Sequence, residues 1–344
     1  MKLSQEVLPR TRAPGRGPVG TGMGTAFGTF GELLQGVLPE EDGDFLVTLP
    51  VARWTRATFR PDPDAADVVV RPARKRKARR LARMILDEAR WPAGGLLTVN
   101  SLIPEGKGLA SSSADLVATA RAVGHALGLK MPASRIEGLL ARIEPTDGVL
   151  YPGIVAFHHR TVRLRAVLGS LPAMAVVGID EGGAVDTIDF NRAPKPFTTA
   201  DRAEYARLLD RLAGAVRRRD LAEVGGIATR SALMNQPLRH KRSLEPMRDI
   251  CREVGGLGIA VGHSGTTLGV LLDTADPAYT HRATAAAQAC TELAGSVAVY
   301  RTLSFPDSAP TRTTPGTPRP ERLPTTRWES PRVRPRGTTA AWSW

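Results

Sequence analysis

Hydrophobic and polar positions in the first half of the chain follow two periods, one of about two residues and one of about 3.6. The short period gives strand-like runs at residues 45–50, 68–70 and 96–103. Apolar residues spaced three and four apart, or helix-forming composition, give helices through residues 81–89, 116–127 and 134–143. Ser134 and Glu137 are spaced as the N-cap and third residue of a capping box at the start of the last helix. This half therefore predicts strands interrupted by three helices.

After Gly153 the hydrophobic pattern changes to short strand-like runs and longer helical runs. Strand patterns lie at residues 154–157, 161–168, 174–178, 260–261, 268–273 and 297–302. Helix patterns lie at residues 205–218, 221–234, 244–254 and 277–294. Strands that are followed by runs of helices predict an α+β fold in layers, not an alternating parallel fold.

Length and composition place the chain among soluble globular proteins. Its 344 residues can bury a sizeable core and favour two domains, and its 42% hydrophobic content is ordinary. Cys251 and Cys290 offer neither a disulfide framework nor a metal quartet, which fits a reducing compartment. No apolar run approaches the ~20 residues of a membrane span, and the N-terminus lacks the apolar core of a signal peptide. We therefore expect a cytoplasmic protein.

The net charge of +13 is unevenly distributed. Residues 1–20 and 306–344 carry much of the excess, and their Arg- and Pro-rich composition predicts a disordered leader and a disordered tail. Residues 71–83 hold eight basic residues and no acidic one. This stretch suggests a nucleic-acid-binding protein as one alternative, although interleaved aromatic residues and a recognised binding motif are missing. A solvated basic helix face is the other interpretation.

The segment at residues 104–115 carries the strongest chemical pattern. A proline-led turn with two glycines runs into three serines, and a helix-forming stretch follows at once. Such a loop can fold backbone N–H groups around a polyphosphate at the positive end of a helix, and serine hydroxyls suit magnesium. Lys107 can neutralise a phosphate as a point charge. The candidate nucleotide-binding residues are Pro104, Gly106, Lys107, Gly108, Leu109, Ala110, Ser111, Ser112 and Ser113.

Three more segments extend this pattern. They lie at residues 28–36 (GTFGELLQG), 144–148 (EPTDG) and 262–269 (GHSGTTLG). Together with the loop they resemble the motifs of the GHMP kinases, the superfamily of galactokinase, homoserine kinase, mevalonate kinase and phosphomevalonate kinase. The resemblance is closest to the L-threonine kinase branch, which makes L-threonine O-3-phosphate for cobalamin biosynthesis. It spans about residues 24 to 273.

The resemblance implies a two-domain fold, with a ribosomal-protein-like α/β domain at residues 21–152 and a ferredoxin-like domain at residues 153–305. The active site is expected between them. It also implies an ATP- and magnesium-dependent kinase that phosphorylates the side-chain hydroxyl of an amino acid, with L-threonine as the first candidate. Another amino acid or an amino alcohol is the alternative acceptor. Members of the superfamily are monomers or homodimers, and either is expected here.

The same resemblance assigns roles to individual residues. Ser112 is expected to meet magnesium, with Ser111 and Ser113 as near competitors, and a carboxylate from Glu137 or Glu144 is expected beside it. Glu137 lies ten residues before Asp147, where the superfamily usually has eleven, and it also has the capping-box role open to it. The metal ligand thus remains a choice between two glutamates.

Asp147 is the main candidate at the acceptor end, either as general base or as partner of a substrate ammonium group. Glu32, in the first motif, is expected to contact substrate or organise the site. In the late motif, hydroxyl groups can hydrogen-bond a substrate carboxylate, although a lone histidine such as His263 is more often structural. The substrate-binding candidates are Thr146, His263, Ser264, Gly265, Thr266 and Thr267.

Overall fold

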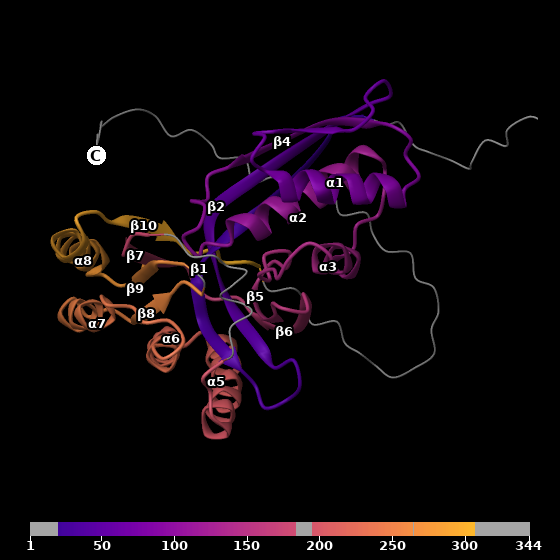
Figure 1. The fold of residues 1–344 in the computed structure, drawn as a ribbon. Coiled ribbons are helices and arrows are strands. Elements are labelled where there is room, and N and C mark those ends of the chain that lie inside the picture. The colour runs from indigo at the N-terminus through magenta and orange to yellow at the C-terminus, as the bar shows by residue number, and fades with distance from the viewer. Residues whose placement is uncertain (1–19, 184–194, 264, 307–344) are drawn as a thin grey trace, which may run out of the picture. The chain divides into compact units, whose positions relative to one another are not determined.

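A ten-stranded sheet runs through both halves of the described chain in the computed structural model (Figure 1). The structure describes residues 20–183, 195–263 and 265–306, so the predicted leader and tail lie almost entirely outside it. The strands are β1 (Gly22–Val37), β2 (Asp44–Asp62), β3 (Val68–Arg71), β4 (Gly94–Ser101), β5 (Ile154–His158), β6 (Arg163–Gly169), β7 (Met174–Asp180), β8 (Gly258–Val261), β9 (Thr267–Asp273) and β10 (Ala298–Arg301). The helices are α1 (Arg76–Glu88), α2 (Ser111–Ala126), α3 (Ala133–Ala141), α5 (Thr199–Arg218), α6 (Leu221–Met234), α7 (Leu244–Glu253) and α8 (Tyr279–Ala294).

Along the sheet the strands follow the order β10-β7-β9-β8-β1-β2-β4-β3, and β5 joins β2 with β6 beyond it. Helix α2 packs on β1 and β2 and α1 on β3 and β4, while α6 to α8 pack on β7 to β9 and α5 packs on α6, β1 and β6 (Figure 1). The predicted α+β fold in layers is confirmed. Pairing of β5 with β2 crosses the expected domain boundary at residue 152, so that boundary stays a prediction.

Strand β2 is longer than the hydrophobic pattern predicts. The prediction stops at Pro50, because proline removes a ladder donor, but β2 continues to Asp62. Pro50 is tolerated because it lies beside a register shift between Phe27 and Gly28 in β1. Beyond the shift, Thr55, Ala57 and Phe59 are buried at every second position and face α2. This extension matters for function because Thr55 reaches the base of the 104–115 loop.

The two helices around that loop also begin at different residues than predicted. Helix α2 starts at Ser111, five residues before the apolar pattern, so the three serines form its first turn. Helix α3 starts at Ala133 with Pro132 as its N-cap, and no side chain caps it. The capping box of Ser134 and Glu137 is therefore wrong, because proline already sets the helix start. Glu137 is left available to other partners.

The two halves of the sheet meet where β1 bulges. Glu32 of β1 pairs with Val261 of β8, between two register shifts in the β1–β2 ladder. The preceding residue, Gly31, has φ of +54°, and a Cβ atom there would lie 2.2 Å from the Val261 carbonyl oxygen. Only glycine permits this approach. The bulge thus brings the first glycine motif against the start of the late motif at Gly262.

The C-terminal half has its own core between the sheet and α7 and α8. It contains Val177, Leu268 and Met247, together with both cysteines. Cys251 and Cys290 are free and buried. None of the described helices has the length and apolarity needed to cross a membrane.

Candidate functional site

The loop before α2 leaves the start of this helix open to a ligand. Gly106 and Gly108 have φ of +73° and +78°, and Ala110, the N-cap residue, has φ of +60°. No side chain caps α2, so no capping side chain accepts from its first N–H groups. These N–H groups and the positive end of the helix dipole can act on a ligand. The Ser111 hydroxyl is buried and has no hydrogen-bond partner among the described residues. An anion at this helix start would satisfy these donors.

The late glycine motif holds the loop in this shape. The Thr267 hydroxyl donates to the Lys107 carbonyl oxygen at 2.9 Å. A Cβ atom on Gly265 would lie 2.0 Å from the same oxygen, and one on Gly108 would lie 2.9 Å from the Gly265 backbone. The two segments therefore pack backbone against backbone. Gly265 is needed for this close approach, and Gly108 is needed for its positive φ as well.

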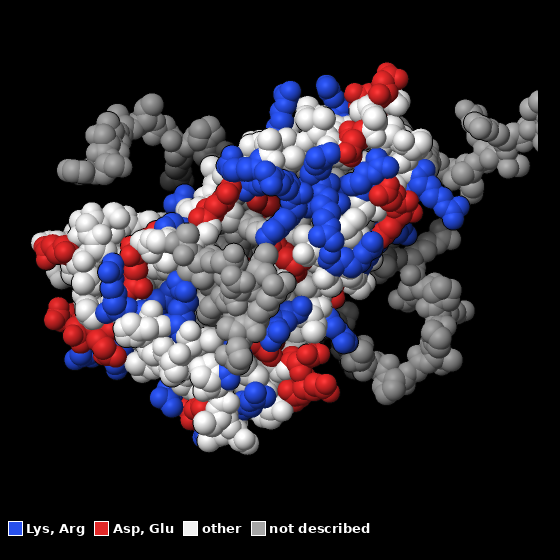
Figure 2. All heavy atoms as spheres, viewed as in Figure 1, with Lys and Arg blue, Asp and Glu red and all other residues white. Residues whose placement is uncertain are grey.

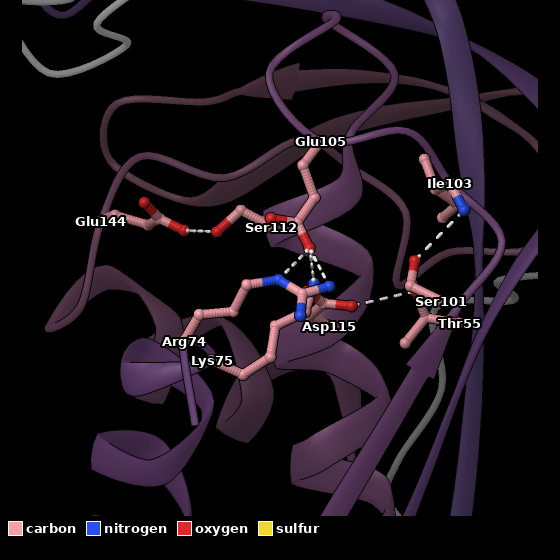
Figure 3. A network of polar contacts seen from close by, with 9 residues as sticks. All are labelled: Thr55, Arg74, Lys75, Ser101, Ile103, Glu105, Ser112, Asp115 and Glu144. Carbon is pink, nitrogen blue, oxygen red and sulfur yellow. Dashed lines mark hydrogen bonds and ion pairs between the residues drawn. The ribbon is translucent and has the colours of Figure 1, made fainter. Parts of the chain in front are cut away.

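A buried ion pair connects the beginning of α2 to the residues just before α1 (Figure 3). The Lys75 ammonium pairs with Asp115 and lies 2.8 Å from Glu105 Oε1. The Thr55 hydroxyl lies 3.0 Å from Asp115 Oδ1 and 2.8 Å from the Ser101 hydroxyl. Burial raises the pKa of Asp115, and Lys75 opposes that rise. Because a buried ion pair is costly to break, we expect this network to fix the loop relative to the sheet.

Two cavities open on either side of the loop. The first, of about 380 Å³, lies between the first turns of α1 and α2. Its wall includes Arg74, Lys75, Arg76, Lys77, Ser111 and Asp115. The second is lined by acidic and histidine side chains, namely Glu32, Glu144, Asp147, His159 and His263, together with the loop. Gly106, Ser111, Ser112 and Lys77 line both cavities.

Of the two glutamates proposed as metal ligands, the structure brings one to the loop. Glu144 accepts a hydrogen bond from the Ser112 hydroxyl and pairs with Lys77 through its other oxygen. Figure 3 shows the Glu144 carboxylate pointing at Ser112. Glu137 lines neither cavity, and its Oε1 accepts hydrogen bonds from the Tyr151 hydroxyl and the Leu164 N–H, both at 2.8 Å. A hydroxyl next to a carboxylate is a donor set that suits magnesium, so Ser112 and Glu144 fit this metal.

Asp147 lies directly at the start of α2. The Ser113 hydroxyl donates to Asp147 Oδ2 at 3.0 Å and accepts the Asp147 N–H at 3.0 Å. Burial raises the pKa of the Asp147 carboxyl to about 6, although Ser113 opposes the shift. Thr146 is buried, and its hydroxyl donates to the Glu144 carbonyl oxygen, which shapes the turn between these two acids. The acceptor motif and the phosphate loop thus share a hydrogen-bonded contact.

Glu32 is the most deeply buried acid of the second cavity, with 2% of its surface exposed. Its Oε2 atom has no hydrogen-bond partner among the residues that the structure describes. Burial, followed by the charge of Asp147, raises the pKa of Glu32 well above its usual range. A cationic group placed between these two carboxyls would be stabilised by both.

The second cavity also contains a pair of histidines. The His159 and His263 rings are edge-to-face with centroids 4.8 Å apart, and His263 Nδ1 lies 2.7 Å from Gln35 Oε1. Burial, and then His159 and nearby cations, lower the pKa of His263 well below its usual value. His263 is therefore neutral near pH 7. It is not the lone histidine that the sequence suggests, and its role in substrate binding stays a prediction.

The hydroxyls of the late motif face protein groups. Thr266 donates to Asp180, Thr267 donates to Lys107 as described above, and Ser264 lies outside the described residues. Asp180 Oδ2 is also 2.5 Å from the Lys107 ammonium. Arg239 and Lys241 both donate to the Gly265 carbonyl oxygen. The role predicted for Gly265, Thr266 and Thr267 in substrate binding stays a prediction, because in this structure they fasten the loop and line neither cavity.

Both halves of the chain match models of one protein family. The model described as "GHMP kinases N terminal domain" matches residues 76–151, and "GHMP kinases C terminal" matches residues 212–289. The chain carries both domains of a GHMP kinase.

Individual relatives agree with this assignment. The L-threonine kinase of Citrobacter freundii is 28% identical over 245 residues, which cover 71% of this chain and 83% of the relative. A homoserine kinase from Cytophaga hutchinsonii superposes with a TM-score of 0.65 at 18% identity, over 85% of this chain and 98% of that one. A structure of MDDEF in complex with MVAPP, AMPPCP and magnesium superposes with a TM-score of 0.61 at 15% identity, over 83% of this chain and 98% of that one. The GHMP kinase two-domain fold is thus confirmed.

The basic stretch at residues 71–83 lies beside the first cavity. Lys and Arg side chains gather over α1 and the loop before it (Figure 2). Five of the eight basic residues form ion pairs with neighbouring acids, namely Arg74, Lys75, Lys77, Arg79 and Arg83. This neutralisation weakens the nucleic-acid interpretation. Sequence inspection missed that Arg74 to Lys77 form a wall of the first cavity, because the stretch matches no kinase motif.

Glu32→Gln is expected to stabilise the fold in a pH-dependent way. Since the folded pKa of Glu32 is raised, the wild type loses stability as pH rises from the unfolded pKa through the folded one. The neutral amide avoids this loss. The midpoint of thermal unfolding should therefore exceed that of wild type by a few degrees at pH 8, and by less at pH 5. Glu41→Gln, at an exposed loop position, is the control and should change neither value. A midpoint lowered equally at both pH values would contradict the expectation.

Proposed function

We propose that this chain is an ATP- and magnesium-dependent kinase that phosphorylates the side-chain hydroxyl of an amino acid, with L-threonine as the first candidate. The observation that carries this proposal is the reciprocal contact between Ser113 and Asp147. Through this contact the 144–148 motif lies at the start of α2, the helix that would hold the phosphates. Positioning two reactants in this way is the main task of an enzyme that transfers phosphoryl groups.

The nucleotide side of the proposed site is the first cavity. The open start of α2, the unpartnered Ser111 hydroxyl and the basic wall at Arg74 to Lys77 all favour bound anions. Ser112 and Glu144 would hold magnesium, which, when bound, neutralises charge on the phosphates. The MDDEF structure, whose complex contains AMPPCP and magnesium, supports this assignment on the same fold.

The acceptor side is the second cavity. Glu32 is buried and Asp147 is half-buried, the charge of Asp147 raises the pKa of Glu32, and an ammonium group between them would offset this repulsion. The acceptor hydroxyl would lie beside Ser113 and Asp147, where Asp147 either accepts the hydroxyl proton or holds the ammonium group. An amino acid with a hydroxyl side chain meets both demands. The L-threonine kinase relative makes threonine the first candidate.

A phosphate-transfer screen tests this proposal. The purified protein is incubated with ATP and magnesium and with L-threonine, L-serine, L-homoserine or an amino alcohol. We expect ADP release and a phosphorylated product, detected by mass, with L-threonine as the best acceptor. A different acceptor at the top of the ranking would correct the substrate only. ATP binding without product from any hydroxylated acceptor would exclude the kinase function.

The pKa of Asp147 predicts the acidic limb of the activity profile. The ionised carboxylate is the form that accepts a proton or binds ammonium, so kcat/KM should rise as pH passes through about 6 and level off above it. Asp147→Asn should remove this limb and lower kcat/KM by about 10²–10⁴-fold. A loss in kcat identifies a base, and a loss mainly in KM for the amino acid identifies an ammonium partner. Asp64→Asn, in an exposed loop, should behave as wild type. A wild-type profile that is flat from pH 5 to 8 would contradict this prediction.

The two glutamates offer a matched test of the metal site. Glu144→Gln should raise the magnesium concentration for half-maximal activity by at least ~10-fold, because it removes the carboxylate beside Ser112. Glu137→Gln removes a carboxylate that faces Tyr151 and Leu164, and it should leave the magnesium dependence unchanged. Magnesium titrations at saturating ATP measure both. The opposite ranking would return the ligand to Glu137.

A further inference from the structure

Lys77 stands at the boundary between the two cavities. It is the second residue of α1, and its ammonium pairs with Glu144 while about half of its side chain remains exposed. Among the lysines and arginines that the structure describes, only Lys77 lines both cavities. The other charged side chains that line the second cavity, Glu32, Glu144 and Asp147, are acidic. Lys77 is therefore the one described lysine or arginine that both cavities share.

In the proposed kinase reaction, phosphoryl transfer would take place beside the residues that line both cavities. A transferred phosphoryl group must leave a donor in one cavity and reach a hydroxyl in the other, so it passes the shared wall. That wall consists of Gly106, Ser111, Ser112 and Lys77. Gly106 and the serines offer N–H and hydroxyl donors, but only Lys77 offers a full positive charge. Charge on the equatorial phosphate oxygens is what an enzyme must neutralise during this step.

We propose that Lys77 is a catalytic residue that contacts the transferred phosphoryl group. This inference rests on the proposed kinase function. In the step, the bond from the γ-phosphorus to the bridging oxygen of the nucleotide breaks, and a bond from the acceptor hydroxyl oxygen to that phosphorus forms. The hydroxyl proton goes to Asp147 or to solvent, and Lys77 keeps its protons. Glu144 holds the ammonium beside the path through an ion pair that is open to solvent on the lysine side.

The neighbouring lysines are committed elsewhere. Lys107, the lysine that the loop sequence suggests for phosphate, pairs with Asp180 and donates to the Gly183 carbonyl oxygen at 3.3 Å, and it lines neither cavity. Lys75 is buried between Glu105 and Asp115. Lys77 also has an acid partner, Glu144, but this partner is the proposed metal ligand beside the transfer path. Lys77 has the most exposed side chain of the three, so it can turn towards a phosphate at the lowest cost.

Nucleotide binding and turnover together test this role. Lys77→Met keeps the length of the side chain and removes its charge, Lys77→Arg keeps the charge, and Arg83→Met is a control on the same helix that lines neither cavity. Calorimetric titrations with MgATP and MgADP are compared with kcat for phosphate transfer. We expect Lys77→Met to lower kcat by about 10²–10³-fold and to remove most of the preference for MgATP over MgADP. Lys77→Arg should recover part of both, and Arg83→Met should match wild type.

Each outcome has a defined meaning. Wild-type kcat and a wild-type ratio of MgATP to MgADP affinity in Lys77→Met would overturn the role. An equal change in both affinities, with an altered magnesium dependence, would also overturn it, because Lys77 would then only position Glu144. If the wild type binds MgATP but transfers phosphate to no acceptor, the proposed function fails, while the affinity ratio still decides whether Lys77 contacts the terminal phosphate. Thermal unfolding midpoints of the variants exclude misfolding as the cause.

Discussion

The rest of the site depends on one backbone contact, between the loop at Lys107 and Gly108 and the late motif at Gly265. This contact leaves no room for a Cβ atom on Gly265, so it exists only because the sequence places glycine there. Thr267 and the pair of Lys107 with Asp180 fasten it from the C-terminal half. The shape of the loop, and with it the open start of α2, is therefore determined jointly by both halves of the chain. Neither half contains a complete site.

Charge is separated across the loop. The side between α1 and α2 combines two helix N-termini with four basic residues, Arg74 to Lys77, which outnumber its two acids, Glu105 and Asp115, whereas the other side contains Glu32 and Asp147. An anion is stabilised on the first side and a cation on the second. A polyphosphate and an aminated acceptor are therefore attracted to opposite sides of the same serines. Lys77 lines both cavities and forms an ion pair with Glu144, so the boundary between the two sides carries one charge of each sign.

The sequence could predict those parts of the fold and site that follow from local backbone rules. The glycine loop, the serines and the Glu144–Asp147 turn each carry their pattern in a few adjacent residues, and the structure brings them together with Glu32. The orientation of Glu137 could not be predicted, because it depends on where α3 begins and on β6 lying beside it. Lys75, Lys77 and Asp180 were missed for a similar reason. Each acquires its partner through a contact between segments that are distant in the chain and match no motif.

Polar atoms buried without a partner at this site lower the stability of the folded protein without ligand. This cost favours the binding of a ligand that would satisfy them. A buried carboxylate such as Glu32 with an oxygen that has no hydrogen-bond partner among the described residues raises the free energy of the folded state. The Ser111 hydroxyl adds a smaller cost of the same kind. Asp115, another buried acid near the loop, has the Lys75 cation beside it. Both of these costs lie where the two cavities meet the loop, and a cation on one side and an anion on the other would remove them.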